Sequence, residues 1–157
     1  MVVEAKVTGI PDLRAALAGI VPKLRRQALR NALAAGARVV RDAARAGAPV
    51  LRIGSRTPYR TPGTVRKAIS VRTSKIARRA GNVGVFVNVR PAKIGARGAK
   101  SKTDPFYWRF LEFGTKKLGA SKFLQGAAGR LGQALEVFKA KIGPAIQKLN
   151  GGKDVQL

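Results

Sequence analysis

Small and apolar residues recur at steps of three and four across residues 23–46. On a helix these steps place the residues on one face, with arginines and lysines on the other side. The positions concerned are Leu24, Ala28, Ala32, Ala35, Val39, Ala43 and Ala46. A second, narrower apolar row consists of Leu29, Leu33 and Val40. This second row either packs inside the same domain or forms a subunit interface.

Helical spacing predicts two further helices. The first follows a short edge strand at residues 2–7 and is expected to kink or split at Pro22. Its apolar stripe is Leu13, Leu17, Ile20 and Val21. The second spans residues 123–149, and Pro144 is expected to interrupt its last turns. Its stripe is Leu124, Ala127, Leu131, Leu135, Phe138 and Ile142.

Alternating residues predict two strands in the middle of the chain. The predicted strands are 65–73 and 82–90. In the second, valines occupy every second position from Val83 to Val89, and the first alternates less cleanly. With the basic connection 74–81 between them, the two strands are expected to form an antiparallel hairpin. Strands and helices therefore fall in separate blocks, which favours the α+β class. We expect a small antiparallel sheet, with the long N-terminal helix and the C-terminal helix packed on it.

Two stretches without periodicity are rich in turn residues and cations, and we interpret them as mobile basic loops at residues 51–63 and 91–104. Together with the hairpin connection, they supply cations that could face DNA or a partner protein. These residues are Arg52, Arg56, Arg60, Arg78, Arg79, Lys93, Arg97, Lys100 and Lys102. Residues 1–150 are predicted to form one domain, followed by a frayed tail at 151–157.

Aromatic residues concentrate in residues 106–113, which hold three of the six phenylalanines, the tryptophan and one of the two tyrosines. A buried ring removes on the order of 150–250 Å² of surface from water, so the segment is predicted to be a strand or helix of the core. Glu112 is expected to be buried there in a structural ion pair with Arg109, Lys116 or Lys117. Gly114 then turns the chain into a basic segment.

The charge of the chain narrows the possible functions. Lysine and arginine number 32 against 7 acidic residues, a formal net charge of +25. Such a balance points to a polyanionic partner, most commonly nucleic acid, although a membrane surface or an acidic protein would also serve. The chain has no cysteine and no histidine, and its acidic residues lie singly, so an enzyme is the least supported reading and no cofactor is expected. It shows neither a signal peptide nor a membrane-spanning run, and no membrane partner is expected.

The segment FYWRFLEFGTKKLGASKFLQGAA resembles a family of tailed-bacteriophage neck proteins, the tail-completion or head–tail joining proteins of lambdoid-type phages. In that family an aromatic-rich Y-x-x-x-x-E-F-G-T precedes a P-F-L and a C-terminal helix. The matching residues here are Tyr107, Glu112, Phe113, Gly114, Thr115, Phe123 and Leu124, and the proline is replaced by Lys122. Upstream, residues 48–50 match an A-P-V that ends a long helix, residues 62–69 match its T-G-x-L-R-x-S-I more weakly, and residues 51–61 look like an insertion.

The resemblance covers roughly residues 5–140 and implies a structural protein of the virion. Such a protein works as a ring of copies that connects head and tail around the DNA channel, beside other neck, portal-side and tail proteins. It is assembled in the host cytoplasm and could touch packaged DNA without reading its sequence. Residues 112–115 then form a structural corner that leads into the last helix. The alternative is a stand-alone protein that binds nucleic acid without sequence preference.

Overall fold

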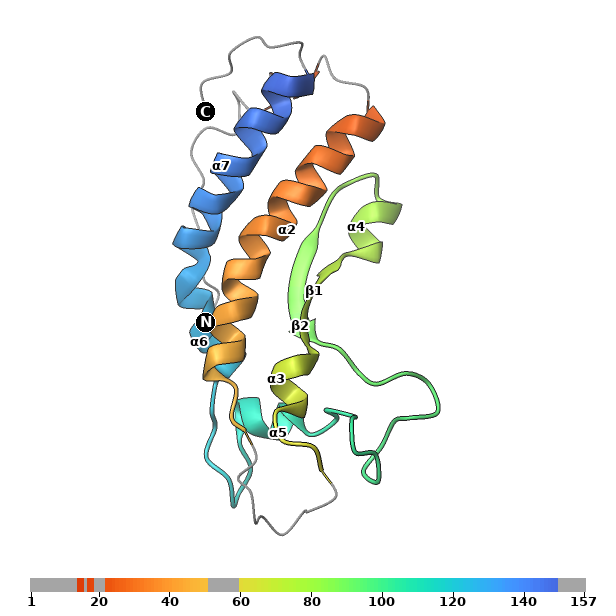
Figure 1. Cartoon of the computed structure of the whole chain (residues 1–157), viewed down its shortest axis with the longest axis vertical. Helices are drawn as coiled ribbons and strands as arrows, with labels where there is room; N and C mark the ends of the chain where they lie inside the picture. The colour runs from red at the N-terminus through yellow and green to blue at the C-terminus, as the bar shows by residue number, and fades with distance from the viewer. Residues whose placement is uncertain (1–13, 16, 19–21, 51–59, 150–157) are drawn as a thin grey trace. The chain divides into compact units, whose positions relative to one another are not determined.

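The computed structural model of the chain describes residues 14–15, 17–18, 22–50 and 60–149. Its elements, in order, are α2 (Pro22–Gly47), α3 (Thr64–Ala68), β1 (Ile69–Thr73), α4 (Lys75–Arg79), β2 (Val85–Val89), α5 (Trp108–Phe113), α6 (Phe123–Ala127), the 3₁₀ turn η1 (Ala128–Arg130) and α7 (Leu131–Leu149). A long N-terminal helix, a two-stranded antiparallel sheet and a C-terminal helix confirm the predicted α+β class (Figure 1). The predicted strand at 2–7 and the tail at 151–157 fall on residues outside those described. Pro22, where a kink or split was predicted, is the first residue of α2, and residues 19–21 just before it are outside those described.

The chain consists of two compact units, and each unit has its own hydrophobic core. The first unit comprises the described parts of 1–39, 72–86 and 130–157, and the second comprises those of 40–71 and 87–129. The helix α2 and the strands β1 and β2 each contribute residues to both units. That residues 1–150 act as one domain stays a prediction.

The core of the first unit forms where α7 runs antiparallel to the first part of α2 (Figure 1). Its buried residues are Leu17, Ala28, Ala32, Ile142 and Ile146. Small residues on α2 allow a close approach, since a Cβ at Gly36 would lie 2.5 Å from the backbone oxygen of Ala134. The predicted interruption at Pro144 was wrong, because α7 continues through this residue. Ile142 and Ile146, on either side of Pro144, are almost completely buried and hold the helix in place.

The core of the second unit joins the end of α2 to the sheet and to α6. Its buried residues are Ala44, Ala48, Val65, Ile69, Val89, Phe123 and Ala127. Arg45 ties α2 to β1 here, because its guanidinium donates two hydrogen bonds, of 3.1 and 2.8 Å, to the carbonyl oxygen of Ile69. Arg66 likewise donates to the carbonyl oxygen of Ala48 at 3.3 Å. Two arginines on the polar side of these elements thus serve the fold.

The buried stripe of α2 differs from the predicted one. It follows steps of four through Ala28, Ala32 and Gly36, and Ala44 lies two such steps further on. Leu24, predicted to be buried, is 43% exposed. Steps of four drift slowly around an α-helix, so the stripe moves off the face that the mixed steps of three and four had indicated. The smallest side chains lie on the stripe, which suits close packing against neighbours.

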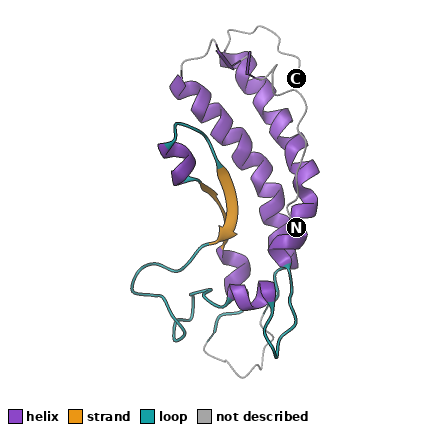
Figure 2. Cartoon of the chain, turned by 180° about the vertical axis from the view of Figure 1, so that it is seen from behind, coloured by secondary structure: helices purple, strands orange, loops and turns teal. Residues whose placement is uncertain are grey.

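The predicted hairpin is present, but its flanks contain helix. Residues 65–68, predicted as strand, belong to α3, whose Val65 and the following Ile69 are four residues apart and both buried. Residues four apart share a face in a helix and in a strand alike, so the burial of both side chains suits either structure. The connection 74–81 holds α4 (Figure 2). This helix is capped by Ser74, whose hydroxyl accepts a hydrogen bond from the amide of Ala77 at 3.2 Å. No helix in the described part of the chain is long and apolar enough to cross a bilayer.

Candidate functional site

The helix α5 turns one side of the aromatic segment toward the core of the second unit. Tyr107, Trp108 and Leu111 pack against that core. The guanidinium carbon of Arg60 lies 4.8 Å from the ring centroid of Tyr107 and 4.9 Å from that of Phe106. Arg60, predicted to be a cation of a mobile loop, is therefore stacked on aromatic rings. Arg52 and Arg56, from the same predicted loop, lie outside the described residues.

Burial raises the pKa of the Tyr107 hydroxyl above its ordinary value. The positive charge of Arg60 and a hydrogen bond with Thr64 act in the opposite direction. Thr64 in turn donates a hydrogen bond to the carbonyl oxygen of Thr61 at 2.6 Å. The start of α3 and the aromatic segment are thus linked through polar atoms as well as through packing.

Three phenylalanines form the other side of the segment, which we call the phenylalanine face: Phe106, Phe110 and Phe113. Their exposed fractions are 39%, 53% and 75%. Because they are four and three residues apart, they share one side of a helical segment. The predicted core role was wrong for these residues, because the opposite side of α5 already fills the space against the core. Composition alone could not tell which side of the helix would be covered.

Glu112 is the residue that connects α5 to α6. It is only 4% exposed, and its two carboxylate oxygens accept hydrogen bonds from the amides of Leu124 and Gln125, each at 2.9 Å. Those amides belong to the first turn of α6, where backbone N–H groups have no partner within the helix. The predicted ion pair is not found among the described residues. The carboxylate instead performs the task of an N-cap side chain from a distant position in the sequence.

Gly114 ends α5 in a backbone conformation that only glycine readily adopts, with φ 78° and ψ 178°. A Cβ at this position would lie 2.8 Å from the oxygen of Leu118 and 2.9 Å from the nitrogen of Ala120. The amide of Gly114 donates to the carbonyl oxygen of Phe110 at 3.0 Å and closes the last turn of α5. The chain can therefore reverse at this point only because the side chain is absent.

Thr115 shapes the basic turn that follows. Its backbone pairs with Leu118 through N–H···O bonds of 2.8 and 3.2 Å, and its hydroxyl accepts hydrogen bonds from the amides of Lys117 and Leu118. Lys116 and Lys117 occupy the exposed end of this turn. The two lysines thus lie at the tip of a hydrogen-bonded turn, and neither pairs with Glu112.

After the basic turn, the chain returns alongside the end of α5 and reaches α6 at Lys122. The amide of Lys122 donates to the carbonyl oxygen of Glu112 at 3.2 Å, and the amide of Ser121 donates to that of Leu111 at 2.8 Å. Lys122 has φ 49°, a left-handed conformation seen at no other described residue except glycines. Proline, with φ fixed near −65°, could not take this position, so the turn here departs from the P-F-L pattern of the resemblance.

Phe123 and Leu124 complete the set of residues matched by the resemblance. Phe123 is 3% exposed within the core, and Leu124 packs against the same core. The structure thus brings Tyr107, Glu112, Gly114 and the start of α6 together within the second unit. We call residues 107–124 the corner.

The other predicted site residues lie on several elements. Leu29 packs against the core of the first unit and Val40 against that of the second, and Leu33 is partly exposed. Their role as a subunit interface stays a prediction. Arg78 and Arg79 are exposed on α4.

The segment 91–104 has an internal anchor that the sequence did not indicate. The carboxylate of Asp104, 4% exposed, accepts hydrogen bonds from the amides of Ala92 at 3.2 Å and Gly98 at 2.7 Å. The cations of this segment remain exposed on its surface. They are Lys93, Arg97, Lys100 and Lys102. Arg97 also donates a hydrogen bond to the carbonyl oxygen of Ala92 at 3.0 Å.

Replacing Gly114 by valine is expected to destabilise the protein by about 3 kcal/mol or more, because strained backbone and a clash with backbone atoms act together. Chemical denaturation measures this loss. Gly119→Ala is the matched control in the same loop, since a Cβ there meets no atom within 4 Å, and it should change stability by less than about 0.5 kcal/mol. Equal stabilities of the two variants would refute the role assigned to Gly114.

Replacing Lys122 by glycine is expected to stabilise the protein by about 0.5–1 kcal/mol. The left-handed conformation costs an L-residue about 1–2 kcal/mol, and the greater unfolded-state entropy of glycine offsets about 0.4–1 kcal/mol of this gain. Lys122→Pro should have the opposite effect, since it forbids the observed φ and removes the hydrogen bond to Glu112. Lys122→Ala removes the same charge without changing the backbone preference in this way, and it should be close to neutral. If glycine and alanine gave equal unfolding free energies, the strain at Lys122 would be disproved.

Comparison with known proteins places the sequence of this chain in a family. Residues 12–114, more than half of the chain, match the HK97-gp10-like family, described as "Bacteriophage HK97-gp10, putative tail-component". The matched region runs from before α2 to the glycine that ends α5. No significant match came from curated proteins or from solved structures. The chain belongs to the HK97-gp10-like family of bacteriophage tail components, and this membership confirms the resemblance to tailed-phage neck and tail proteins.

Proposed function

We propose that this phage tail component is a structural protein of the neck, which assembles as a ring of copies joining head and tail around the DNA channel. In this proposal it has no catalytic role, and it contacts other neck, portal-side and tail proteins after assembly in the host cytoplasm. The observation that carries the proposal is the phenylalanine face. A highly charged protein that leaves Phe110 and Phe113 more than half exposed has a surface suited to burial against another protein.

The corner gives this face the rigidity that an assembly surface needs. Phe113 directly follows Glu112, whose carboxylate is fixed by two backbone amides of α6. Leu111 on the other side of Glu112 packs into the core. Side chains held in place before binding lose less conformational entropy when they bind. The aromatic rings are therefore held in position before a partner protein binds, as anchor residues at interfaces commonly are.

A ring requires a head-to-tail contact, in which the phenylalanine face of one copy meets a different surface of the next. Copies carrying a formal charge of +25 repel each other at low ionic strength. Salt shortens the screening length from about 10 Å at 0.1 M to about 3 Å at 1 M. Self-assembly should therefore strengthen with salt if apolar contacts drive it, whereas assembly through charge pairs would weaken.

The double variant Phe110→Ser, Phe113→Ser is expected to weaken self-association by at least about 30-fold, the effect of losing about 2 kcal/mol at an interface. Light scattering of the purified full chain across protein and salt concentration measures this change. The control is Ile76→Ser on α4. The side chain of Ile76 is 81% exposed, and this variant should leave self-association unaltered.

Virions made with these variants extend the test to function. Heads and tails should accumulate unjoined with the double phenylalanine variant and join normally with the Ile76 variant. A wild-type chain that stays monomeric at high salt, together with normal joining by the phenylalanine variant, would contradict the proposed assembly.

A further inference from the structure

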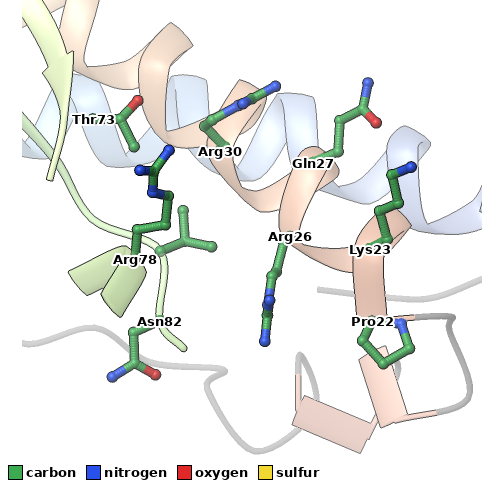
Figure 3. Close-up of a pocket in the computed structure, with 9 residues that line it drawn as sticks. Pro22, Lys23, Arg26, Gln27, Arg30, Thr73, Arg78 and Asn82 are labelled. Atoms are coloured by element: carbon green, nitrogen blue, oxygen red, sulfur yellow. The ribbon is translucent and has the colours of Figure 1, made fainter. Parts of the chain in front are cut away.

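The first unit contains a basic pocket that takes no part in the corner. It has a volume of about 710 Å³ and is formed by the first turns of α2, the end of β1, α4 and the residues that follow α4. Its lining residues are Pro22, Lys23, Arg26, Gln27, Arg30, Thr73, Arg78, Asn82 and Val83. Figure 3 shows Lys23, Arg26 and Arg30 projecting from α2, and Arg78 rising on the α4 side of the same opening.

Four cations therefore line one opening, and no carboxylate lines it. Within the described part of the chain, none of these four side chains donates a hydrogen bond or forms an ion pair. The described residues of this unit include a single acid, Glu136, and it pairs with Lys139 on α7 at 3.3 Å. Like charges gathered in this way raise the energy of the free protein, and an anion in the pocket would remove that cost.

The position on α2 adds to the positive potential. Lys23 and Arg26 belong to the beginning of α2, a 26-residue helix with no acidic residue in its first turn. The N-terminal end of a long helix already carries partial positive charge, and proteins usually place carboxylates there. Here lysine and arginine take the place of such carboxylates, which increases the attraction of this end of α2 for an anion. Gln27, Thr73 and Asn82 add neutral hydrogen-bonding groups around the opening.

We propose that this pocket binds phosphodiester groups of the DNA backbone. Arginine suits this ligand because its planar guanidinium donates paired hydrogen bonds to phosphate oxygens. The four cations are long, exposed side chains rather than a buried cage, which favours a run of phosphates over one small enclosed anion. Contacts to phosphates carry no direct sequence information, so binding by this pocket is independent of base sequence. The site does not depend on ring assembly and would operate in a single copy of the chain.

The test compares two variants that remove equal charge from the full-length protein. The pocket variant is Arg26→Gln, Arg30→Gln, Arg78→Gln, and the control is Arg130→Gln, Lys141→Gln, Lys148→Gln, three exposed cations outside the pocket. Fluorescence anisotropy of a short DNA duplex across salt concentrations gives the affinity and its salt dependence. The pocket variant should lose more than ten-fold in affinity, and its slope of log K against log salt should fall by about 2–3, the value for three lost phosphate contacts.

The control variant should lose no more than about three-fold, since it changes only the general electrostatic attraction. Thermal melting checks folding, and DNA should raise the melting temperature of the wild type more than that of the pocket variant. Equal losses by the two variants, or no DNA binding by the wild type at low salt, would overturn the proposal. Inorganic phosphate, tested as a competitor at the same phosphate concentration, should displace DNA poorly. Displacement as efficient as that by unlabelled DNA would assign the pocket to free phosphate instead.

Discussion

The buried carboxylate of Glu112 is the interaction on which the corner depends. A carboxylate removed from water is costly unless hydrogen bonds replace its hydration, and the amides of Leu124 and Gln125 supply two of them. The start of α6 gains equally, because the N-cap residue Lys122 makes no side-chain hydrogen bond to it. Two neighbours of Glu112 in sequence then have opposite roles. Leu111 packs against the core and Phe113 is exposed. Glu112, which lies between them, therefore couples the folding of the corner to the proposed assembly surface.

A second acidic residue, Asp104, is used in the same way as Glu112. Asp104 and Glu112 are both buried, and both accept hydrogen bonds from backbone amides. They organise loops and helix ends and make no ion pair among the described residues. The large surplus of lysine and arginine therefore remains for partners outside the chain. An exposed aromatic face in one unit and a cationic pocket in the other agree with a protein that is stabilised by assembly and by a polyanion.

Much of the fold follows from local pattern. The spacing of small residues predicted α2 to within one residue at each end, and the alternating valines identified β2. Val65 was assigned to a strand because alternation and helical spacing cannot be separated in so short a run. The partners of Glu112 were beyond prediction for a different reason. They lie 12 and 13 residues ahead and come within reach only through the turns at Gly114 and Lys122, whereas lysines and an arginine stand close by in sequence. The phenylalanine face was missed because only packing decides which side of α5 is covered.

The most direct test of this account is amide hydrogen exchange in the Glu112→Gln variant, which keeps the size of the side chain and removes its charge. Glu136→Gln, at an exposed position on α7, serves as the control. We predict that the amides of Leu124 and Gln125 lose protection selectively in the Glu112 variant. Its free energy of unfolding should fall by about 1.5–3 kcal/mol, the contribution of hydrogen bonds to a charged group. Unchanged protection at both amides, with stability equal to that of the control, would contradict the central place given to Glu112.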